Sequence, residues 1–176
     1  MRFKGLEIRE PKKSDSPKLY LDFINDIIEE DGFILINEKP TFNEEKKWLT
    51  DRIKNISNGS ELCLSVFDLE KVVGNAQAIR DKWKDSGNVH LGIAISRNYR
   101  GIGLGEKLLR LLIVKTQLKF NPKNIYLRVF SDNKIAKNLY RKVGFRKIAH
   151  FPNWTKHKGK YVSHDYMVLK KFEEEK

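Results

Sequence analysis

Apolar residues at two different spacings divide the first sixty positions into one strand and two helices. The alternation over Leu6–Arg9 has the period of a strand. Ser16-Pro17 is a typical helix start, and it is followed at helical spacing by the apolar residues Leu19, Phe23, Ile24, Ile27 and Ile28. Thr41 and Glu44 have the spacing of a capping box, which predicts a second helix that ends near Asn58-Gly59.

Three β-rich runs occupy the middle of the chain. The runs Leu62–Asp68 and Val72–Arg80 are separated by a short polar connection and predict a hairpin. The run Asn88–Ser96 alternates strictly and predicts a fourth strand. One of its faces carries Val89, Leu91, Ile93 and Ile95, and the other carries His90, Gly92 and Ala94.

The remaining pattern alternates between helices and strands. A glycine-dense segment at 100–105 opens a helix that Asn121-Pro122 ends. Beyond it the pattern predicts a strand over 125–129, a short helix over 133–142 that ends at Gly144, and strands over 145–151 and 161–170. We therefore expect one mixed α/β (α+β) domain that spans residues 1–176.

The composition is that of a folded chain without a membrane segment. Hydrophobic residues make up 40% and charged residues 33% of the chain. The longest apolar stretches, such as Leu111–Val114, are far shorter than the roughly 20 residues of a membrane helix. No apolar leader core precedes the first strand, which predicts a cytoplasmic protein. The lone Cys63 can supply neither an internal disulfide nor a zinc cluster, so no metal is expected.

The chain is strongly basic. It contains 35 Lys and Arg against 23 Asp and Glu, a formal net charge of +12. Such a surface attracts nucleic acid, acidic proteins and polyphosphate cofactors alike. Charge therefore favours an anionic partner without choosing its class.

The run Arg100–Gly105 contains three alternate glycines between an apolar strand and an amphipathic helix. Glycine lets the backbone approach a ligand closely, and the N–H groups at a helix start point outward with the positive end of the helix dipole. Such a loop binds phosphate, whereas a plain turn would need only one glycine. The dinucleotide fingerprint G-x-G-x-x-G is absent because Glu106 or Leu108 stands where its last glycine belongs, and no Walker Gly-Lys-Ser/Thr occurs.

The pattern that remains, R-x-x-G-x-G, resembles the pyrophosphate-binding motif of the GNAT acetyltransferase superfamily. A second run, Val129–Phe145, resembles the other signature of that family, with a turn at Asn133, a helix bearing Leu139-Tyr140 and a closing Gly144-Phe145. The resemblance covers residues 62–170. It implies a GNAT-like, largely antiparallel sheet of six to seven strands flanked by about four helices.

The resemblance also implies an activity, namely direct transfer of acetyl from acetyl-CoA to a primary amine. The residues matching the family's pyrophosphate site are Arg100, Gly101, Ile102, Gly103, Leu104, Gly105 and Glu106. The fourth-strand backbone that stabilises the oxyanion in this family corresponds to Ile93, Ala94 and Ile95. Asn133 would cap its helix and bond the pantetheine arm, and Tyr140 matches the acid that protonates the departing thiolate.

The general base is where the sequence departs from the family. Some relatives that acetylate protein N-termini carry Glu on the fifth strand, but the matching position here is Arg128, whose guanidinium cannot act as a base. His90 is the best replacement because imidazole titrates near neutrality. Glu44, Glu45 and Asp165 are weaker candidates, and a water relay stays open.

The acceptor is left open by the sequence. Protein lysines, N-termini and small amines all remain, because loops set acceptor choice. Candidate acceptor-side segments are 31–40, 81–87 and 151–169. The net charge favours an acidic or zwitterionic acceptor over a polyamine. The alternative is a basic module that binds nucleic acid or the ribosome through an inactive acyl-CoA fold, and either a monomer or a homodimer fits.

Overall fold

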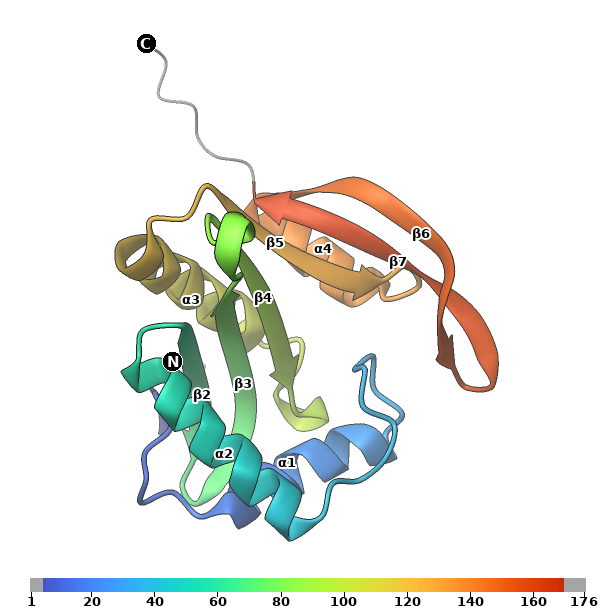
Figure 1. The fold of residues 1–176 in the computed structure, drawn as a ribbon. Helices are drawn as coiled ribbons and strands as arrows, with labels where there is room; N and C mark the ends of the chain where they lie inside the picture. Colours follow the sequence, from blue (N-terminus) through green and yellow to red (C-terminus); the bar gives the residue numbers. More distant parts are fainter. Residues whose placement is uncertain (1–4, 170–176) are drawn as a thin grey trace.

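The computed structural model describes residues 5–169 and contains seven strands and four α-helices in that range (Figure 1). In chain order they are β1 (Leu6–Arg9), α1 (Pro17–Glu29), α2 (Phe42–Ser57), β2 (Glu61–Asp68), β3 (Lys71–Arg80), β4 (Asn88–Ile95), α3 (Leu104–Phe120), β5 (Asn124–Phe130), α4 (Lys134–Val143), β6 (Phe145–His157) and β7 (Lys160–Leu169). Short 3₁₀ turns, η1 (Trp83–Asp85) and η2 (Arg97–Tyr99), flank β4. The predicted order is confirmed.

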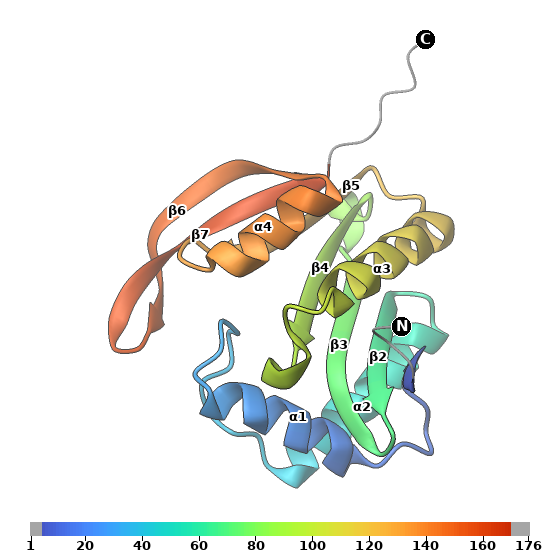
Figure 2. The same cartoon turned by 180° about the vertical axis from the view of Figure 1, so that it is seen from behind.

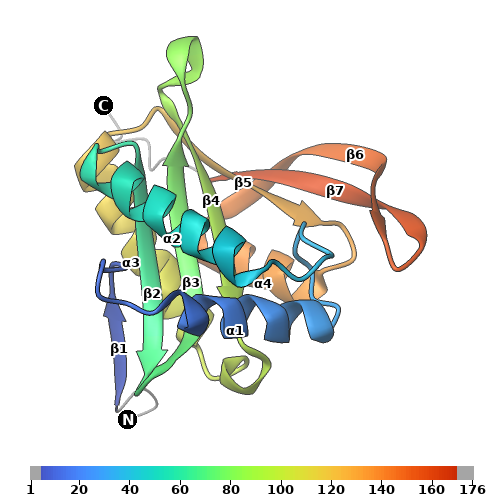
Figure 3. The ribbon, with the colours of Figure 1, turned by 60° about the horizontal axis from the view of Figure 1, so that its bottom comes forward.

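All seven strands form one sheet in the order β1-β2-β3-β4-β5-β7-β6. Every neighbouring pair is antiparallel except β4 with β5, which is parallel. Helices α3 and α4 lie on one face of the sheet (Figure 2), and α1 and α2 lie on the other (Figure 3). This is the mixed, largely antiparallel architecture that the resemblance implied.

Each face of the sheet has its own apolar core. Under α3 the core contains the inward residues of the central strands together with Leu104, Leu108 and Leu112. Under α1 and α2 a smaller core contains Tyr20 and Phe67. The predicted faces of β4 are confirmed, because its odd-numbered apolar residues join the α3 core and Ala94 packs on the opposite side.

The strands β4 and β5 are paired only at one end. Their ladder joins Asn88–His90 to Asn124–Tyr126 and then stops, although β4 continues to Ile95 and β5 to Phe130. Beyond the ladder β5, β7 and β6 swing away from β4 (Figure 1). The two strands therefore diverge in the middle of the sheet, and the region between their unpaired halves is here called the β4/β5 gap.

Strand β6 is longer than the pattern predicted. It runs to His157 rather than stopping at Phe151. Pro152 looked like a strand end because proline cannot donate to a ladder. The structure accommodates it in a register shift between Phe151 and Thr155, with Asn153 at φ 50°. The predicted last residue of β7, Lys170, lies outside the described residues.

Candidate active site

The glycines of the loop before α3 have two different roles. Gly101 and Gly103 have φ of 74° and 92°, a left-handed conformation that residues with a Cβ adopt only at a cost. Gly103 is also the N-cap of α3. Gly105 is helical, and a Cβ there would lie 3.4 Å from Leu139 Cδ2 on α4. Two glycines thus shape the loop, and the third lies where α3 contacts α4.

The backbone amides of this loop are available to a ligand. Lys107 N donates to Gly103 O at 3.1 Å, but within the described range no acceptor is found for the N–H groups of residues 101–106. These groups surround the N-terminus of a 17-residue helix, where the helix dipole favours negative charge. The arrangement is suited to a pyrophosphate.

Arg100 is held beside this loop by two partners. Its Nε donates to Ile95 O at 2.8 Å, and its guanidinium pairs with Glu30, the C-cap of α1. An anion that takes Arg100 must therefore compete with Glu30. Arg97 lies 3.9 Å from the same carboxylate and could then replace Arg100 there.

The alternation of β4 determines which of its amides face the β4/β5 gap. Ser96 N donates to Val73 O on β3 at 2.9 Å, so even-numbered residues of β4 direct their backbone polar groups toward β3. Ala94 therefore belongs to the β3 ladder, and Ile93 and Ile95 present their N–H groups to the gap. The register passes through Gly92 without a shift, so β4 is regular there.

The helix α4 begins as predicted. Asn133 is its N-cap, with Oδ1 accepting from Ala136 N at 3.0 Å. Tyr140 lies in the α3 core, 6.0 Å from the ring of Phe145 between centroids. Burial raises the pKa of Tyr140 to about 12, so its phenol stays protonated at neutral pH. No hydrogen bond in the described range uses that hydroxyl.

His90 stands at the last rung of the β4–β5 ladder, opposite Tyr126. The two rings are 5.2 Å apart, and the Tyr126 hydroxyl donates to Asp81 at 3.1 Å. Burial and the charge of Arg128 lower the pKa of His90, outweighing the opposite effect of Asp81. The imidazole is therefore neutral at pH 7 and able to accept a proton.

The other candidate bases differ in their environments. Glu44 accepts from Thr41 N at 2.7 Å in the predicted capping box, which lowers its pKa. Burial opposes ionisation of Asp165, but hydrogen bonds from groups that include Lys137 and His150 outweigh it and hold the pKa of this carboxyl well below its usual range. Both carboxylates are engaged structurally. Glu45 is buried, and burial raises its pKa to about 7.

Glu45→Gln is expected to stabilise the protein at pH 8 and to leave its stability unchanged at pH 4. The folded-state pKa of Glu45 is about 7, whereas its ordinary value is 4.5. Between pH 4.5 and 7 the folded protein therefore keeps a proton on Glu45 that the unfolded chain has lost. The stability of the wild type falls as the pH rises through this range. We expect a gain in unfolding free energy of roughly 2–4 kcal/mol at pH 8, measured by urea denaturation. The neighbour Glu44→Gln should show the opposite sign, and a loss of stability in Glu45→Gln at pH 8 would refute the assignment.

Two of the candidate acceptor-side segments meet. Phe33, from the loop after α1, stacks 5.4 Å from His157 near the β6–β7 turn and lies 5.5 Å from Phe130 at the end of β5. Asp31 and Lys158 pair at 3.1 Å, and a cavity of about 320 Å³ lies between the two segments. The segment 81–87 instead lies at the opposite end of β4 from the glycine loop (Figure 3).

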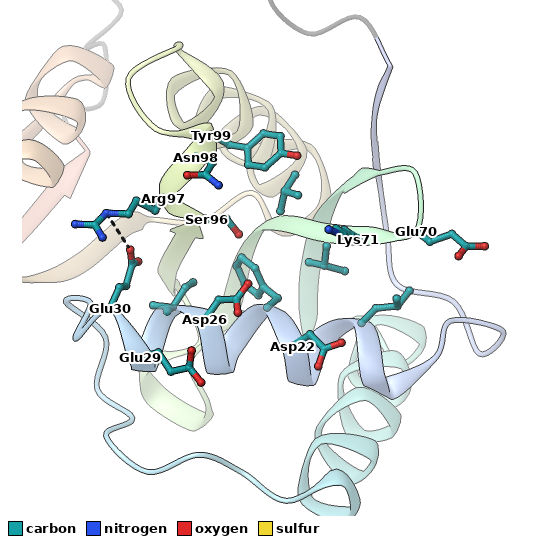
Figure 4. Close-up of a pocket in the computed structure, with 15 residues that line it drawn as sticks. Asp22, Asp26, Glu29, Glu30, Glu70, Lys71, Ser96, Arg97, Asn98 and Tyr99 are labelled. Carbon is teal, nitrogen blue, oxygen red and sulfur yellow. Dashed lines mark ion pairs between the residues drawn. The ribbon is translucent and has the colours of Figure 1, made fainter.

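A larger groove of about 670 Å³ lies between α1, the β2–β3 turn and η2 (Figure 4). Its acidic lining consists of Asp22, Asp26, Glu29, Glu30 and Glu70, and its basic residues are Lys71 and Arg97. None of its lining residues belongs to β5. The groove therefore adjoins the glycine loop rather than the paired end of the β4/β5 gap.

Two negative findings concern the described residues 5–169. No group of three or more His, Cys, Asp or Glu there could hold a metal ion. None of the helices in that range has the length and apolarity to cross a membrane.

The glycine loop, the β4/β5 gap and the Asn133 cap all lie within a range of the chain that matches a known protein family. The model of the acetyltransferase (GNAT) family matches residues 21–145. The chain belongs to this family. The matched range includes all of α2 and α1 from residue 21 onward, although neither helix carries one of the two signature motifs.

Named GNAT relatives match over a limited stretch. A probable spermine N(1)-acetyltransferase of Bacillus subtilis subsp. natto is 40% identical over 52 residues, 30% of this chain and 34% of the relative. An N-alpha-acetyltransferase of Sulfurisphaera tokodaii is 34% identical over 58 residues, 33% of this chain and 35% of the relative. The matched stretch thus spans about a third of the length of each curated relative.

The fold comparison covers nearly the whole chain. A putative acetyltransferase from Salmonella typhimurium, solved with its cofactor acetyl-CoA, superposes with a TM-score of 0.81 over 98% of this chain and 97% of the other. The two sequences are 19% identical. The GNAT fold is therefore shared throughout, while the acceptor differs among the named relatives.

Proposed function

We propose that this protein is an N-acetyltransferase that transfers acetyl from acetyl-CoA directly to a primary amine. The observation that carries the proposal is the row of unpartnered amides over residues 101–106, placed at the open end of the β4/β5 gap. Residues 1–176 would form one acetyltransferase domain. The protein would act in the cytoplasm as a monomer or homodimer.

The loop would bind the diphosphate of acetyl-CoA. Amides 101–106 would donate to phosphate oxygens, and Arg100 would exchange Glu30 for the pyrophosphate. The Nδ2 of Asn133 would bond the pantetheine arm while its Oδ1 keeps the α4 cap. The thioester would then lie in the β4/β5 gap, where Ile93 N–H is directed.

The transfer would use three groups of this chain. A neutral His90 would take the proton of the attacking amine as the new C–N bond forms. The Ile93 N–H would stabilise the oxyanion that develops on the carbonyl. As the C–S bond breaks, Tyr140 would give its proton to the thiolate and recover it from solvent.

The environment of the cysteine supports direct attack over an acetyl-enzyme. Cys63 is fully buried, and Asn75 Nδ2 donates to its sulfur at 3.3 Å. Burial raises the pKa of this thiol to about 11, so it is not a nucleophile at neutral pH. The acceptor amine would therefore attack the thioester itself.

The role of His90 has a pH signature. The reaction needs both the acceptor amine and His90 unprotonated, so the slope of log(kcat/KM) against pH should steepen below pH 6.5, the ordinary imidazole pKa. In His90→Gln we expect kcat/KM to fall about 100-fold and the steepening to disappear. His150→Gln, an exposed residue bonded to Asp165, is the control. If the steepening persisted in His90→Gln, His90 would not be the general base.

The activity is tested by thiol release across a panel of amines, with mass spectrometry of the products. The panel contains amino acids, peptides with free N-termini, lysine peptides and polyamines. We expect CoA release in a one-to-one ratio with an acetylated amine for at least one class. If the protein bound acetyl-CoA saturably but acetylated no amine of the four classes, the result would count against acetyltransferase activity.

A further inference from the structure

Arg128 is a partly buried arginine without a carboxylate partner. The described residues include two other partly buried arginines, and each pairs with an acid: Arg9 with Asp15 and Arg52 with Glu61. No ion pair or hydrogen bond among residues 5–169 uses the guanidinium of Arg128. Since a partly desolvated charge is costly unless it is paired, an anion that binds there would be favoured.

Arg128 faces the side of the sheet opposite to α3. Its neighbours Leu127 and Val129 are buried in the core under α3, so Arg128 points to the opposite face. It lies two residues beyond Tyr126, the last paired residue of β5 against β4, and opposite Tyr166 on β7. The guanidinium is thus placed next to the closed end of the β4/β5 gap, on the same face as His90.

The surroundings of Arg128 hold further unsatisfied polar groups and few anions. His164 is 1% exposed, and neither of its ring nitrogens has a hydrogen-bond partner. The positive charge of Arg128 contributes to lowering the pKa of both His90 and His164. The acids that act on these histidines are already engaged, Asp81 by Tyr126 and Asp165 by Lys137 and Lys147.

The walls around this charge are aromatic. Tyr126 and Tyr166 stack with centroids 6.4 Å apart, and Phe151 lies 5.0 Å from Tyr166. Phe130 lies 4.4 Å from His164. A site with one unpaired guanidinium among aromatic rings fits a molecule with an anionic group on a small apolar body.

We propose that Arg128 binds a carboxylate of the acceptor, so that the preferred acceptors are amines carrying a carboxylate close to the reacting nitrogen. This rests on the proposed acetyltransferase function and narrows its substrate class. A polyamine would bring only positive charge to the guanidinium, so the expected acceptor differs from the spermine in the name of the Bacillus relative.

The test uses pairs of amines that differ only in the carboxylate. Lysine is compared with cadaverine, phenylalanine with 2-phenylethylamine, and the dipeptide amide Ala-Glu with Ala-Gln. We expect the wild type to favour the carboxylate member by about 10- to 100-fold in kcat/KM, mainly through KM. The first two pairs detect an amino-acid carboxylate, and the third detects an acidic side chain of a peptide.

Arg128→Met is expected to remove this preference while leaving acetyl-CoA affinity unchanged. Arg128→Lys should restore part of it, because a lysine keeps the charge but not the two-pronged geometry. The exposed Arg146→Met removes the same net charge from the surface of β6 and should keep the preference. Thermal melts are measured to check that each variant folds.

The outcomes of these experiments separate the role of Arg128 from the proposed acetyltransferase function. Acetyl transfer that ignores the carboxylate in all three pairs, or a preference that survives Arg128→Met, would overturn the role of Arg128 and leave the acetyltransferase intact. A preference for cadaverine and other polyamines would also overturn it. Acetyl-CoA binding without transfer to any member would count against the proposed function itself.

Discussion

Gly103→Trp is expected to weaken acetyl-CoA binding at least 100-fold. Gly103 has φ 92° at the N-cap of α3, a conformation that a tryptophan adopts only with strain. The indole would also cover the amides of residues 101–106. Each charge-assisted hydrogen bond is worth about 1.5–3 kcal/mol, so losing two reaches the stated factor.

Calorimetric titration with acetyl-CoA measures this loss. Gly59→Trp is the matched control, because Gly59 also has a positive φ of 78° but follows α2 and has open space around its Cβ position. Unchanged affinity in Gly103→Trp would refute the site. Short duplex DNA is titrated in parallel. If the wild type bound DNA but not acetyl-CoA, the basic nucleic-acid module would become the better account of the +12 charge.

Tyr140→Phe is expected to lower kcat by about 100- to 1,000-fold with little change in acetyl-CoA affinity. The substitution removes one oxygen atom from a ring that packs in the α3 core. Because no hydrogen bond in the described range uses the hydroxyl, the fold should not depend on it. The loss should therefore fall on protonation of the departing thiolate.

Single-turnover kinetics and thermal melts separate these effects. Tyr20→Phe is the matched control, since Tyr20 is also buried but its hydroxyl donates to Asp15 at 3.2 Å. That variant should lose stability and keep kcat. If Tyr140→Phe retained the wild-type rate of acetyl transfer, the proton would come from elsewhere and Tyr140 would be a packing residue.

The sequence predicted those parts of the fold that local rules determine. The caps at Ser16, Thr41 and Asn133 are set by residues within one turn, and each is present. The faces of β4 follow from strict alternation. The predicted end of β6 at Phe151 is wrong because a bulge at Asn153 accommodates Pro152 within the strand. A single proline does not reveal whether a strand ends or shifts its register.

The site contains features that no local pattern encodes. The early end of the β4–β5 ladder and the place of β7 between β5 and β6 are properties of the whole sheet. The pair between Arg100 and Glu30 joins residues 70 positions apart. The sequence singled out Arg128 as an unsuitable base, but its lack of a partner becomes visible only when β5 and β7 are placed.

The most direct test of the account is a single-turnover reaction with acetyl-CoA labelled in its acetyl group, with enzyme in excess and an accepted amine added last. We expect unlabelled protein before the amine is added, and afterwards labelled amine formed together with one thiol per acetyl transferred. Label that first accumulates on the protein and then passes to the amine, or thiol release without amine acetylation, would contradict direct transfer.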